Sequence, residues 1–508
     1  MPSNGVADVC MIVEGTYPYV RGGVSTWIHN LITALPEKTF RILFVGPGPQ
    51  TEYEPRYEIP ENVLGIDMLF AQDFRQESMR TRGPVREDRE SKDAAWRVMK
   101  ELHEGLAKSP GVPLFDEAYR AVGDPEERTL SVEELFGSPR SWELVVEMYR
   151  EGGSGASFVD YYWTWRFTHL PLFQMMQAEI PPARIYHTVS TGFAGFLAAI
   201  AKKRTGRPMI VTEHGVYTRE RSIEIAQAEW IFVQQAQDYV IRRTQGFFKR
   251  WWTEMFRMMS RLCYAEADRV ITITQVNQPY QLEDGADPER MSVIPNGIRL
   301  ERFEAARELP RPDDEFVVGF VGRVVPIKDV KTFLRAVKMA AANVPNLKAY
   351  VIGPTEEDPE YFAECERLTG LLDLGEHVVY TGPQDVVEYY GRMHALVLTS
   401  ISEGQPLVIM EANAAGVPVI ATNVGACSEL LHGRTPEDRA LGPGGIVTAV
   451  ASPAETADAI VRLATDPALR ERMRRAGIAR MERFYREEAL NETYRGIYES
   501  LASRSGRR

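Results

Sequence analysis

Two glutamates with seven residues between them, Glu403 and Glu411, form the most informative pattern in this sequence. They follow an apolar run at residues 395–399 that predicts a strand, and the intervening residues begin with Gly404, Gln405, Pro406 and Leu407. Proline suits the first turn of a helix, so we expect a helix to begin here, with free backbone N–H groups and a positive dipole end that attract phosphate. Carboxylates accept hydrogen bonds from sugar hydroxyls, but the same spacing also fits an ordinary strand, loop and helix with two solvated glutamates.

Two cations follow another predicted strand, at residues 317–321. Gly322 and Arg323 come directly after it, and Lys328 lies five residues further on. A guanidinium fork and an ammonium point charge together would neutralise a diphosphate. Cations are common on any surface, but the carboxyl ends of parallel strands meet at one sheet edge. This placement favours one anion site shared with the two glutamates.

Paired glycines follow the first predicted strand, at residues 9–13. Gly22 and Gly23 precede a helical pattern at residues 25–35. Paired glycines let backbone amides approach a ligand closely, although they also occur in ordinary tight turns. The spacing is not G-x-G-x-x-G, which argues against a dinucleotide-dependent dehydrogenase.

Two histidines, His187 and His214, lie near the carboxyl ends of predicted strands. We place both in the candidate site, although a lone histidine is more often structural. No Asp-x-Asp pair follows a strand, so we expect no metal site. Cations and helix ends would then have to stabilise a leaving diphosphate.

Composition restricts the class of protein. The chain has 508 residues, 59 basic against 71 acidic side chains, and a net charge of −12, which argues against nucleic-acid binding. The longest small and apolar run, residues 190–201, is shorter than the ~20 residues of a membrane-spanning helix. The first residues lack a basic segment typical of a signal peptide, and the four cysteines are scattered. We therefore expect a cytoplasmic protein.

Short β-branched runs alternate with helical patterns in two successive series, separated near residues 294–298. This alternation predicts an α/β protein with two doubly wound parallel sheets. The charged, helix-like residues 69–182 interrupt the first series and predict a helical insertion. Residues 247–262 carry aromatic and methionine side chains at helical spacing beside four cations, which favours a core helix over a membrane or partner surface.

With these motifs in view, the sequence resembles the retaining GT-B glycosyltransferases of family four. Glu403 and Glu411 match the E-x7-E signature, Arg323 and Lys328 the donor-phosphate pair, and Gly22-Gly23 the N-terminal glycine loop. The resemblance implies two Rossmann-like domains facing across a cleft. The first covers residues 1–298 with its insertion, the second residues 299–485, and a last helix in residues 486–508 crosses back.

The resemblance also implies residue roles. Glu411 would bind the ribose and Glu403 the transferred hexose, with the backbone N–H groups of residues 404–407. Gly322, Arg323 and Lys328 would hold the diphosphate. Gly22 and Gly23 would contact the donor, and His214 would lie beside the sugar. His187 joins the donor-binding residues from its position at the end of a strand. The expected catalytic residues are Glu403, His214, Arg323 and Lys328, with no metal and no cofactor besides the UDP-sugar donor.

The opening residues 13–25, residues 212–221 and the length resemble the branch that makes the biofilm exopolysaccharide Pel. That implies transfer from UDP-glucose or a UDP-N-acetylhexosamine to a growing polysaccharide, in the cytoplasm and beside inner-membrane Pel synthase subunits. A GT-B nucleotide-sugar epimerase and a non-catalytic UDP-sugar-binding subunit remain alternatives. The hexose, acceptor, linkage and oligomeric state stay open at this point.

Overall fold

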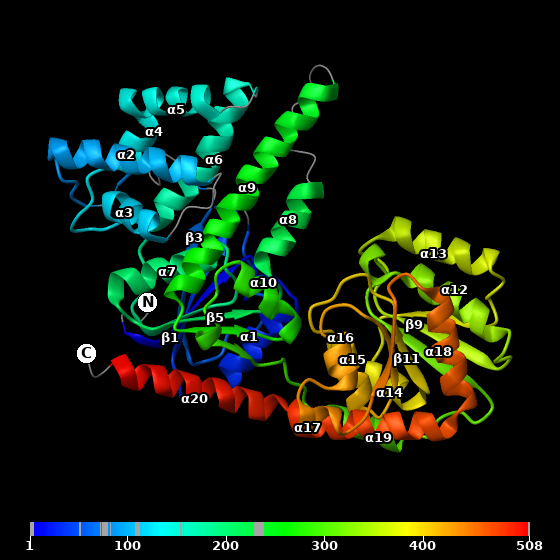
Figure 1. Ribbon diagram of the computed structural model, residues 1–508. Coiled ribbons are helices and arrows are strands. Elements are labelled where there is room, and N and C mark those ends of the chain that lie inside the picture. Colours follow the sequence, from blue (N-terminus) through cyan, green and yellow to red (C-terminus); the bar gives the residue numbers. More distant parts are fainter. Residues whose placement is uncertain are drawn as a thin grey trace. The chain divides into compact units, whose positions relative to one another are not determined.

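The chain forms two compact units (Figure 1). The computed structural model describes residues 5–49, 52–71, 73, 80–81, 83–106, 112–152, 155, 157–227 and 238–505. The first unit contains Met1–Thr272, Asn277–Ser292 and Tyr494–Arg508, and the second contains Ile273–Val276 and Val293–Thr493. The sequence placed residues 273–276 and 293–298 in the N-terminal domain. They belong to the second unit because Thr274 Oγ1 donates to Glu429 Oε1 at 2.8 Å and the Asn296 N–H donates to Gln405 Oε1 at 2.7 Å.

The first unit is built on a seven-stranded sheet with the order β3-β2-β1-β4-β5-β6-β7. Its strands are β1 (Ala7–Glu14), β2 (Phe40–Gly46), β3 (Val63–Phe70), β4 (Ala183–Thr188), β5 (Met209–Glu213), β6 (Arg269–Thr272) and β7 (Met291–Val293). β1 runs parallel to both of its neighbours, β2 and β4. Every residue of β2 is buried, which is typical of a parallel strand covered on both faces.

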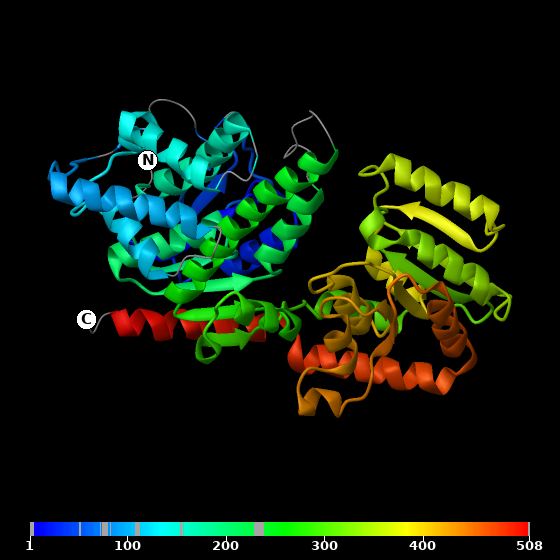
Figure 2. The ribbon, with the colours of Figure 1, turned by 45° about the horizontal axis from the view of Figure 1, so that its top comes forward.

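Helices cover this sheet and build the insertion, which is coloured blue to cyan in Figures 1 and 2. Those next to the sheet are α1 (Gly23–Ala34), α7 (Phe193–Thr205), α8 (Tyr217–Gln227), α9 (Asp238–Glu266) and α10 (Gln278–Glu283). The insertion contains α2 (Arg89–Leu106), α3 (Val112–Val122), α4 (Val132–Gly137), α5 (Pro139–Gly152) and α6 (Phe158–Met176). Leu69 and Phe70, predicted to open the insertion, instead end β3, an edge strand that the sequence did not reveal because it alternates poorly and is only half-buried.

The aromatic segment at residues 247–262 lies within α9 and packs in the core. Trp251, Met255 and Met259 are buried against the insertion helices and the sheet. Arg250 is exposed on another side of the helix. This confirms the core interpretation of the segment.

The second unit has a six-stranded sheet with the order β10-β9-β8-β11-β12-β13. Its strands are β8 (Phe316–Val321), β9 (Leu347–Ile352), β10 (Val378–Gly382), β11 (Ala395–Leu398), β12 (Val419–Thr422) and β13 (Gly445–Thr448). Its helices are α11 (Glu301–Glu308), α12 (Val330–Ala341), α13 (Pro359–Leu371), α14 (Val386–Arg392), α15 (Leu407–Ala414), α16 (Cys427–His432), α17 (Pro436–Arg439), α18 (Pro453–Thr465) and α19 (Pro467–Phe484). Val318 and Phe320 of β8 enter one hydrophobic cluster and Val317 and Val321 enter another, so both faces of the sheet are covered.

The last helix, α20 (Glu487–Ser505), begins in the second unit and ends in the first. In the first unit, Tyr494 and Tyr498 are buried, and Tyr498 Oη lies 2.7 Å from His187 Nδ1. In the part of the chain that the structure describes, no helix is long and apolar enough to cross a bilayer. All four cysteines are buried and unpaired.

A fully buried ion pair fixes α19 against α17. Arg480 Nε donates to Asp438 Oδ1 at 2.6 Å, and its other nitrogens donate to the backbone oxygens of Leu431, Asp438 and Gly442. Neither side chain is more than 3% exposed. The Arg480 guanidinium is shielded from water, so its positive charge is compensated by the Asp438 carboxylate and not by hydration.

Replacing Asp438 with Ala should lower the free energy of unfolding of the second unit by about 3–5 kcal/mol, because it leaves a buried unpaired cation. The matched control is Glu471→Ala on α19, which removes a partly exposed pair with Arg474 and should cost less than about 1 kcal/mol. Chemical denaturation followed by circular dichroism measures both. Equal losses in the two variants would contradict the assigned role of Asp438.

Candidate functional site

The second sheet reverses its strand order between β8 and β11. These strands are neighbours and run parallel, with Val318 opposite Ala395. In doubly wound sheets, ligands bind beyond the carboxyl ends of the strands at this point of reversal. The two loops singled out in the sequence, one after β8 and one after β11, therefore leave the sheet side by side.

The loop after β8 is held in an unusual backbone conformation that presents Lys328. Gly322 has a φ of 154°, and a Cβ on Gly353 would come within 2.1 Å of the Gly322 oxygen, so the loops after β8 and β9 pack backbone to backbone. Asp329 follows in the left-handed region and its side chain caps α12. Thr399, at the end of β11, donates to the backbone oxygen of Asp329 at 2.9 Å and so links the loop after β8 to the loop after β11.

Lys328 and Glu403 meet directly. Lys328 Nζ lies 2.5 Å from Glu403 Oε1, and Ser400 Oγ donates to the same oxygen at 2.6 Å. The lysine and glutamate side chains are only 19% and 11% exposed. Gly425 has a φ of 49°, and a Cβ on it would come within 2.0 Å of the backbone oxygen of Glu403. The loop after β12 therefore packs closely against the loop that carries Glu403. The ion pair is therefore held in place from three sides.

Arg323 lies in a different environment from Lys328. It pairs with Glu357, and both side chains are about half-exposed, at 52% and 51%. An exposed pair of this kind contributes little to stability, so an incoming anion can displace Glu357 at low cost.

The helix that follows Glu403 starts without a side-chain cap. Pro406 occupies the cap position of α15, and it makes no side-chain capping hydrogen bond to the first turn. Gln405 is buried and its side chain accepts from the Asn296 N–H, so it fixes the segment at residues 293–298. Leu407 is 39% exposed at the helix start. The uncapped first turn can accept an anion.

Glu411 lies one helical turn deeper and does not contact Glu403. Tyr390 of α14 is fully buried, and its hydroxyl donates to Glu411 Oε2 at 2.9 Å. Burial raises the pKa of the Glu411 carboxyl, while the Tyr390 hydrogen bond and the Arg302 charge act in the opposite direction. The tyrosine fixes the carboxylate in one orientation.

In the first unit, Gly22 and Gly23 open α1 without any steric need for glycine. A Cβ on either residue would meet nothing within 4 Å, and Gly22 has an extended φ of 171°. Packing within this unit therefore does not explain the glycine pair.

His214 follows β5 and packs edge-on against Trp27 of α1, with ring centroids 4.8 Å apart. Its Nε2 is buried and has no hydrogen-bond partner among the described residues. Burial lowers the pKa of the ring to about 4, so the imidazole is neutral near pH 7. A neutral ring with one unpaired nitrogen can bind a polar ligand group.

His187 differs from its expected role as a donor-binding residue. It lies within β4, is completely buried, and both ring nitrogens have partners. Nδ1 lies 2.7 Å from Tyr498 Oη and Nε2 lies 2.9 Å from Thr212 Oγ1. Burial, reinforced by His214, lowers its pKa to about 3. In this arrangement it anchors α20 and has no ring nitrogen left for a ligand.

The structure adds positioning residues that the sequence did not reveal. Ser400, Tyr390 and Trp27 touch Glu403, Glu411 and His214, respectively. Only Ser400 had a sequence signal, since it directly follows a predicted strand and precedes Glu403 by three residues. Tyr390 reaches Glu411, and Trp27 reaches His214, from distant segments of the chain. In the described part of the chain, no three His, Cys, Asp or Glu side chains lie close enough to hold a metal ion. That the reaction proceeds without a metal stays a prediction.

Glu213, next to His214, is completely buried at the end of β5. It accepts hydrogen bonds from Tyr264 Oη at 2.5 Å and Gln281 Nε2 at 2.8 Å. Burial is the largest effect on this carboxyl and raises its pKa to about 7. The folded chain therefore keeps a proton that the unfolded chain loses near pH 4.5.

This difference predicts that Glu213 stabilises the fold fully below about pH 4.5 and that the contribution disappears as the pH rises through about 7. The thermal midpoint of the native chain should fall more between pH 5 and pH 8 than that of Glu213→Gln. Glu224→Gln, an exposed glutamate on α8, should follow the native profile. Identical slopes for the native chain and Glu213→Gln would rule out the raised pKa.

Comparisons with known proteins match both parts of the chain. Residues 7–289, more than half of the chain, match the family described as "Domain of unknown function (DUF3492)", and residues 301–480 match "Glycosyl transferases group 1". A D-inositol 3-phosphate glycosyltransferase of Acidothermus cellulolyticus is 33% identical over 260 residues, which are 47% of this chain and 55% of the relative. One of Actinosynnema mirum is 31% identical over 41% of this chain and 51% of the relative. The chain thus spans about half the length of these curated relatives.

Solved structures share the fold. Anabaena HepE in complex with UDP matches 97% of this chain and 99% of its own, with a TM-score of 0.58 and 14% identity. Sucrose-phosphate synthase of Thermosynechococcus elongatus matches 97% and 99%, with a TM-score of 0.55 and 19% identity. Together with the family matches and the two parallel sheets, these similarities give the fold as GT-B. The chain belongs to the DUF3492 family, and its residues 301–480 match the group 1 glycosyltransferases.

Proposed function

We propose that the chain is a retaining glycosyltransferase that moves a hexosyl unit from a UDP-sugar to a growing exopolysaccharide. The observation that carries this proposal is the Lys328–Glu403 pair beside the uncapped start of α15, with the Tyr390-bound Glu411 deeper in the same helix. The lysine and the start of the helix suit the diphosphate of one elongated donor. The Glu403 carboxylate suits its hexose, and the Glu411 carboxylate suits its ribose.

In the proposed reaction, the bond between the anomeric carbon and the diphosphate oxygen breaks, and its electron pair stays on UDP. The acceptor hydroxyl attacks the anomeric carbon from the same face, and its proton passes to the leaving phosphate oxygen. Lys328, Arg323 and the first-turn N–H groups of α15 stabilise the charge that develops on the diphosphate. Glu403 holds the hexose hydroxyls, and no covalent sugar–enzyme intermediate is required.

The relatives support a nucleotide-sugar donor. HepE is described in complex with UDP, with UDP and glucose, and with UDP-glucose. The E-x7-E resemblance agrees with a UDP-sugar, and we favour UDP-glucose, with a UDP-N-acetylhexosamine as the second choice. The resemblance also assigns Gly22, Gly23 and His214 to the donor, and those roles stay expectations.

For the acceptor, we propose a Pel-type polysaccharide and a role like that of PelF. The support is the resemblance of residues 13–25 and 212–221 and of the chain length to that protein. The proposal includes a cytoplasmic location, beside inner-membrane Pel synthase subunits, and no nucleic-acid partner. The inositol phosphate named for the curated relatives is the alternative acceptor class.

Purified protein should release UDP from at least one UDP-hexose in the presence of EDTA. Glu411→Ala should abolish release, and Tyr390→Phe should weaken UDP binding about fivefold, because a net hydrogen bond is worth about 1 kcal/mol. Tyr389→Phe is the matched control, since Tyr389 packs on Tyr350 and not on Glu411.

Neither UDP release nor UDP binding by the native chain would contradict the transferase proposal. UDP binding without release from any donor, with or without a glycan acceptor, would favour the non-catalytic subunit. Conversion of the UDP-sugar to its epimer would favour the epimerase.

Replacing Lys328 with Ala should lower kcat about 100-fold, because it removes a charge aimed at the leaving diphosphate. Lys331→Ala is the matched control: Lys331 lies three residues further on, pairs with Glu364, and should leave kcat unchanged. Initial-rate measurements of UDP release compare the two variants. A similar kcat in both would remove Lys328 from the catalytic machinery.

A further inference from the structure

A cavity of about 570 Å³ lies within the first unit, between the insertion helices α2, α5 and α6 and the long helix α9. Its volume is in the range of small-molecule sites, about 300–1,000 Å³. The residues on which the argument depends are Glu104, Glu151, Tyr161, Phe247, Arg250 and Trp251. All belong to the first unit, so this cavity is distinct from the Lys328–Glu403 site.

A chain of hydrogen bonds fixes which groups of this wall donate and which accept. His169 Nδ1 lies 2.9 Å from the Trp165 carbonyl oxygen, which can only accept, so Nδ1 carries the proton and Nε2 accepts. His103 Nδ1, 3.3 Å away, donates to that Nε2, and His103 Nε2 accepts from Tyr161 Oη at 2.7 Å. Burial lowers the pKa of both rings, so they stay neutral. The chain of hydrogen bonds therefore fixes the Tyr161 hydroxyl as the donor to His103 and holds this buried wall of the cavity in one arrangement.

Aromatic rings form one side of the cavity. Tyr161 and Phe247 are nearly parallel, with an interplanar angle of 17°, and Trp251 lies edge-on to Tyr161 at 5.2 Å. The Trp251 indole N–H is buried and has no hydrogen-bond partner among the described residues. Tyr161 and Trp251 are almost fully buried, so the half-buried Phe247 is the ring of these three that a ligand in the cavity can contact.

Carboxylates form the other side, and they already have counter-ions. Lys100 Nζ lies 3.1 Å from Glu151 and 3.6 Å from Glu104, and Arg250 adds a further cation to the lining. An organic cation would have to compete with these resident charges. A neutral hydroxylated ligand would not, because it can donate to the paired carboxylates and accept from Arg250.

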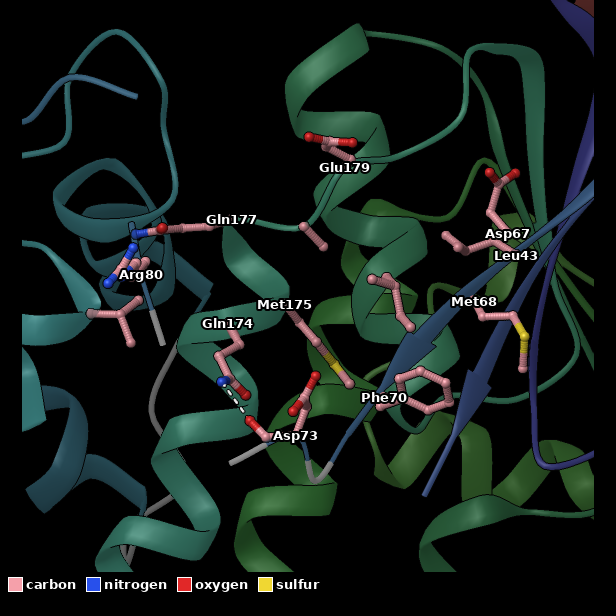
Figure 3. A pocket seen from close by; sticks show the side chains of 13 residues that line it. Leu43, Asp67, Met68, Phe70, Asp73, Arg80, Gln174, Met175, Gln177 and Glu179 are labelled. Atoms are coloured by element: carbon pink, nitrogen blue, oxygen red, sulfur yellow. Dashed lines mark hydrogen bonds between the residues drawn. The ribbon is translucent and has the colours of Figure 1, made fainter. Parts of the chain in front are cut away.

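A neighbouring cavity of about 390 Å³, along β3, lacks this arrangement (Figure 3). Asp67 is bound by Arg41 at 2.6 Å, and Gln174 Nε2 donates to the Asp73 backbone oxygen at 2.9 Å, as Figure 3 shows for the latter pair. We assign it no ligand.

We propose that the cavity between α2, α5, α6 and α9 is a glycan-binding site that places a neutral hexose unit against the half-buried Phe247 ring and holds its hydroxyls with Glu104, Glu151 and Arg250. A second glycan site on the insertion would keep an oligosaccharide attached to the protein independently of the donor. The inference concerns a different site from the proposed transferase site and stands whether or not the chain transfers sugar.

Isothermal titration of the full chain with three tetrasaccharides tests the proposal: one of glucose, one of N-acetylglucosamine and one of glucosamine. We expect a neutral tetrasaccharide to bind, and Glu151→Ala and Arg250→Ala each to weaken binding about tenfold, as for a lost hydrogen bond to a charged group. Both side chains are exposed enough for the variants to fold. Glu147→Ala is the matched control, because Glu147 pairs with the same Lys100 from the same helix but does not line the cavity.

Binding that survives saturation with UDP would place the glycan outside the donor site and support the proposal. Absence of binding by both neutral tetrasaccharides would overturn it. So would binding of the amine-bearing tetrasaccharide alone, equal weakening by Glu147→Ala and Glu151→Ala, or displacement of the glycan by UDP.

Discussion

The ion pair between Lys328 and Glu403 is the interaction around which the second unit is arranged. A 2.5 Å contact between groups that are mostly buried requires that both loops be fixed before the charges meet, since desolvation costs each ion several kcal/mol. Thr399 and Ser400 provide this at the end of β11, and glycines at positions 353 and 425 let neighbouring loops approach to backbone contact. A diphosphate bound as we propose would meet a lysine whose position is already set, so little of its binding energy would be used to order the site.

Burial also determines the protonation of groups in both units. Glu411 and Glu213 have raised pKa values, and His187 and His214 have lowered ones, in each case mainly because the charged form loses its hydration. Burial therefore shifts each of these groups toward its neutral form, and tyrosine and glutamine side chains orient the two carboxyl groups by hydrogen bonds. For His187 the outcome is structural, because its two nitrogens anchor α20 and a threonine of β5.

The insertion extends the core of the first unit. Its helices share one hydrophobic cluster with β1, β2 and α9, and the aromatic stripe of α9 packs between them. Such a continuous core makes the insertion a fixed part of the unit, and the chain of hydrogen bonds from Tyr161 to the Trp165 carbonyl fixes the buried wall of its cavity. In this way the insertion adds a cavity with a polar rim to the first unit without interrupting the sheet.

The sequence by itself determined the α/β class, the two series of strands, the helical character of the insertion and the loops that bear Glu403, Glu411, Arg323 and Lys328, because strand periodicity, glycine turns and helix starts are local signals. It missed β3, whose edge position leaves it half-buried and irregular in pattern. Only the tertiary structure decided that Lys328 pairs with Glu403, that Tyr390 orients Glu411 and that His187 is enclosed by Tyr498. Each of these contacts joins residues 21 or more positions apart in the chain, and such pairings follow from sheet order and helix packing, which local spacing does not encode.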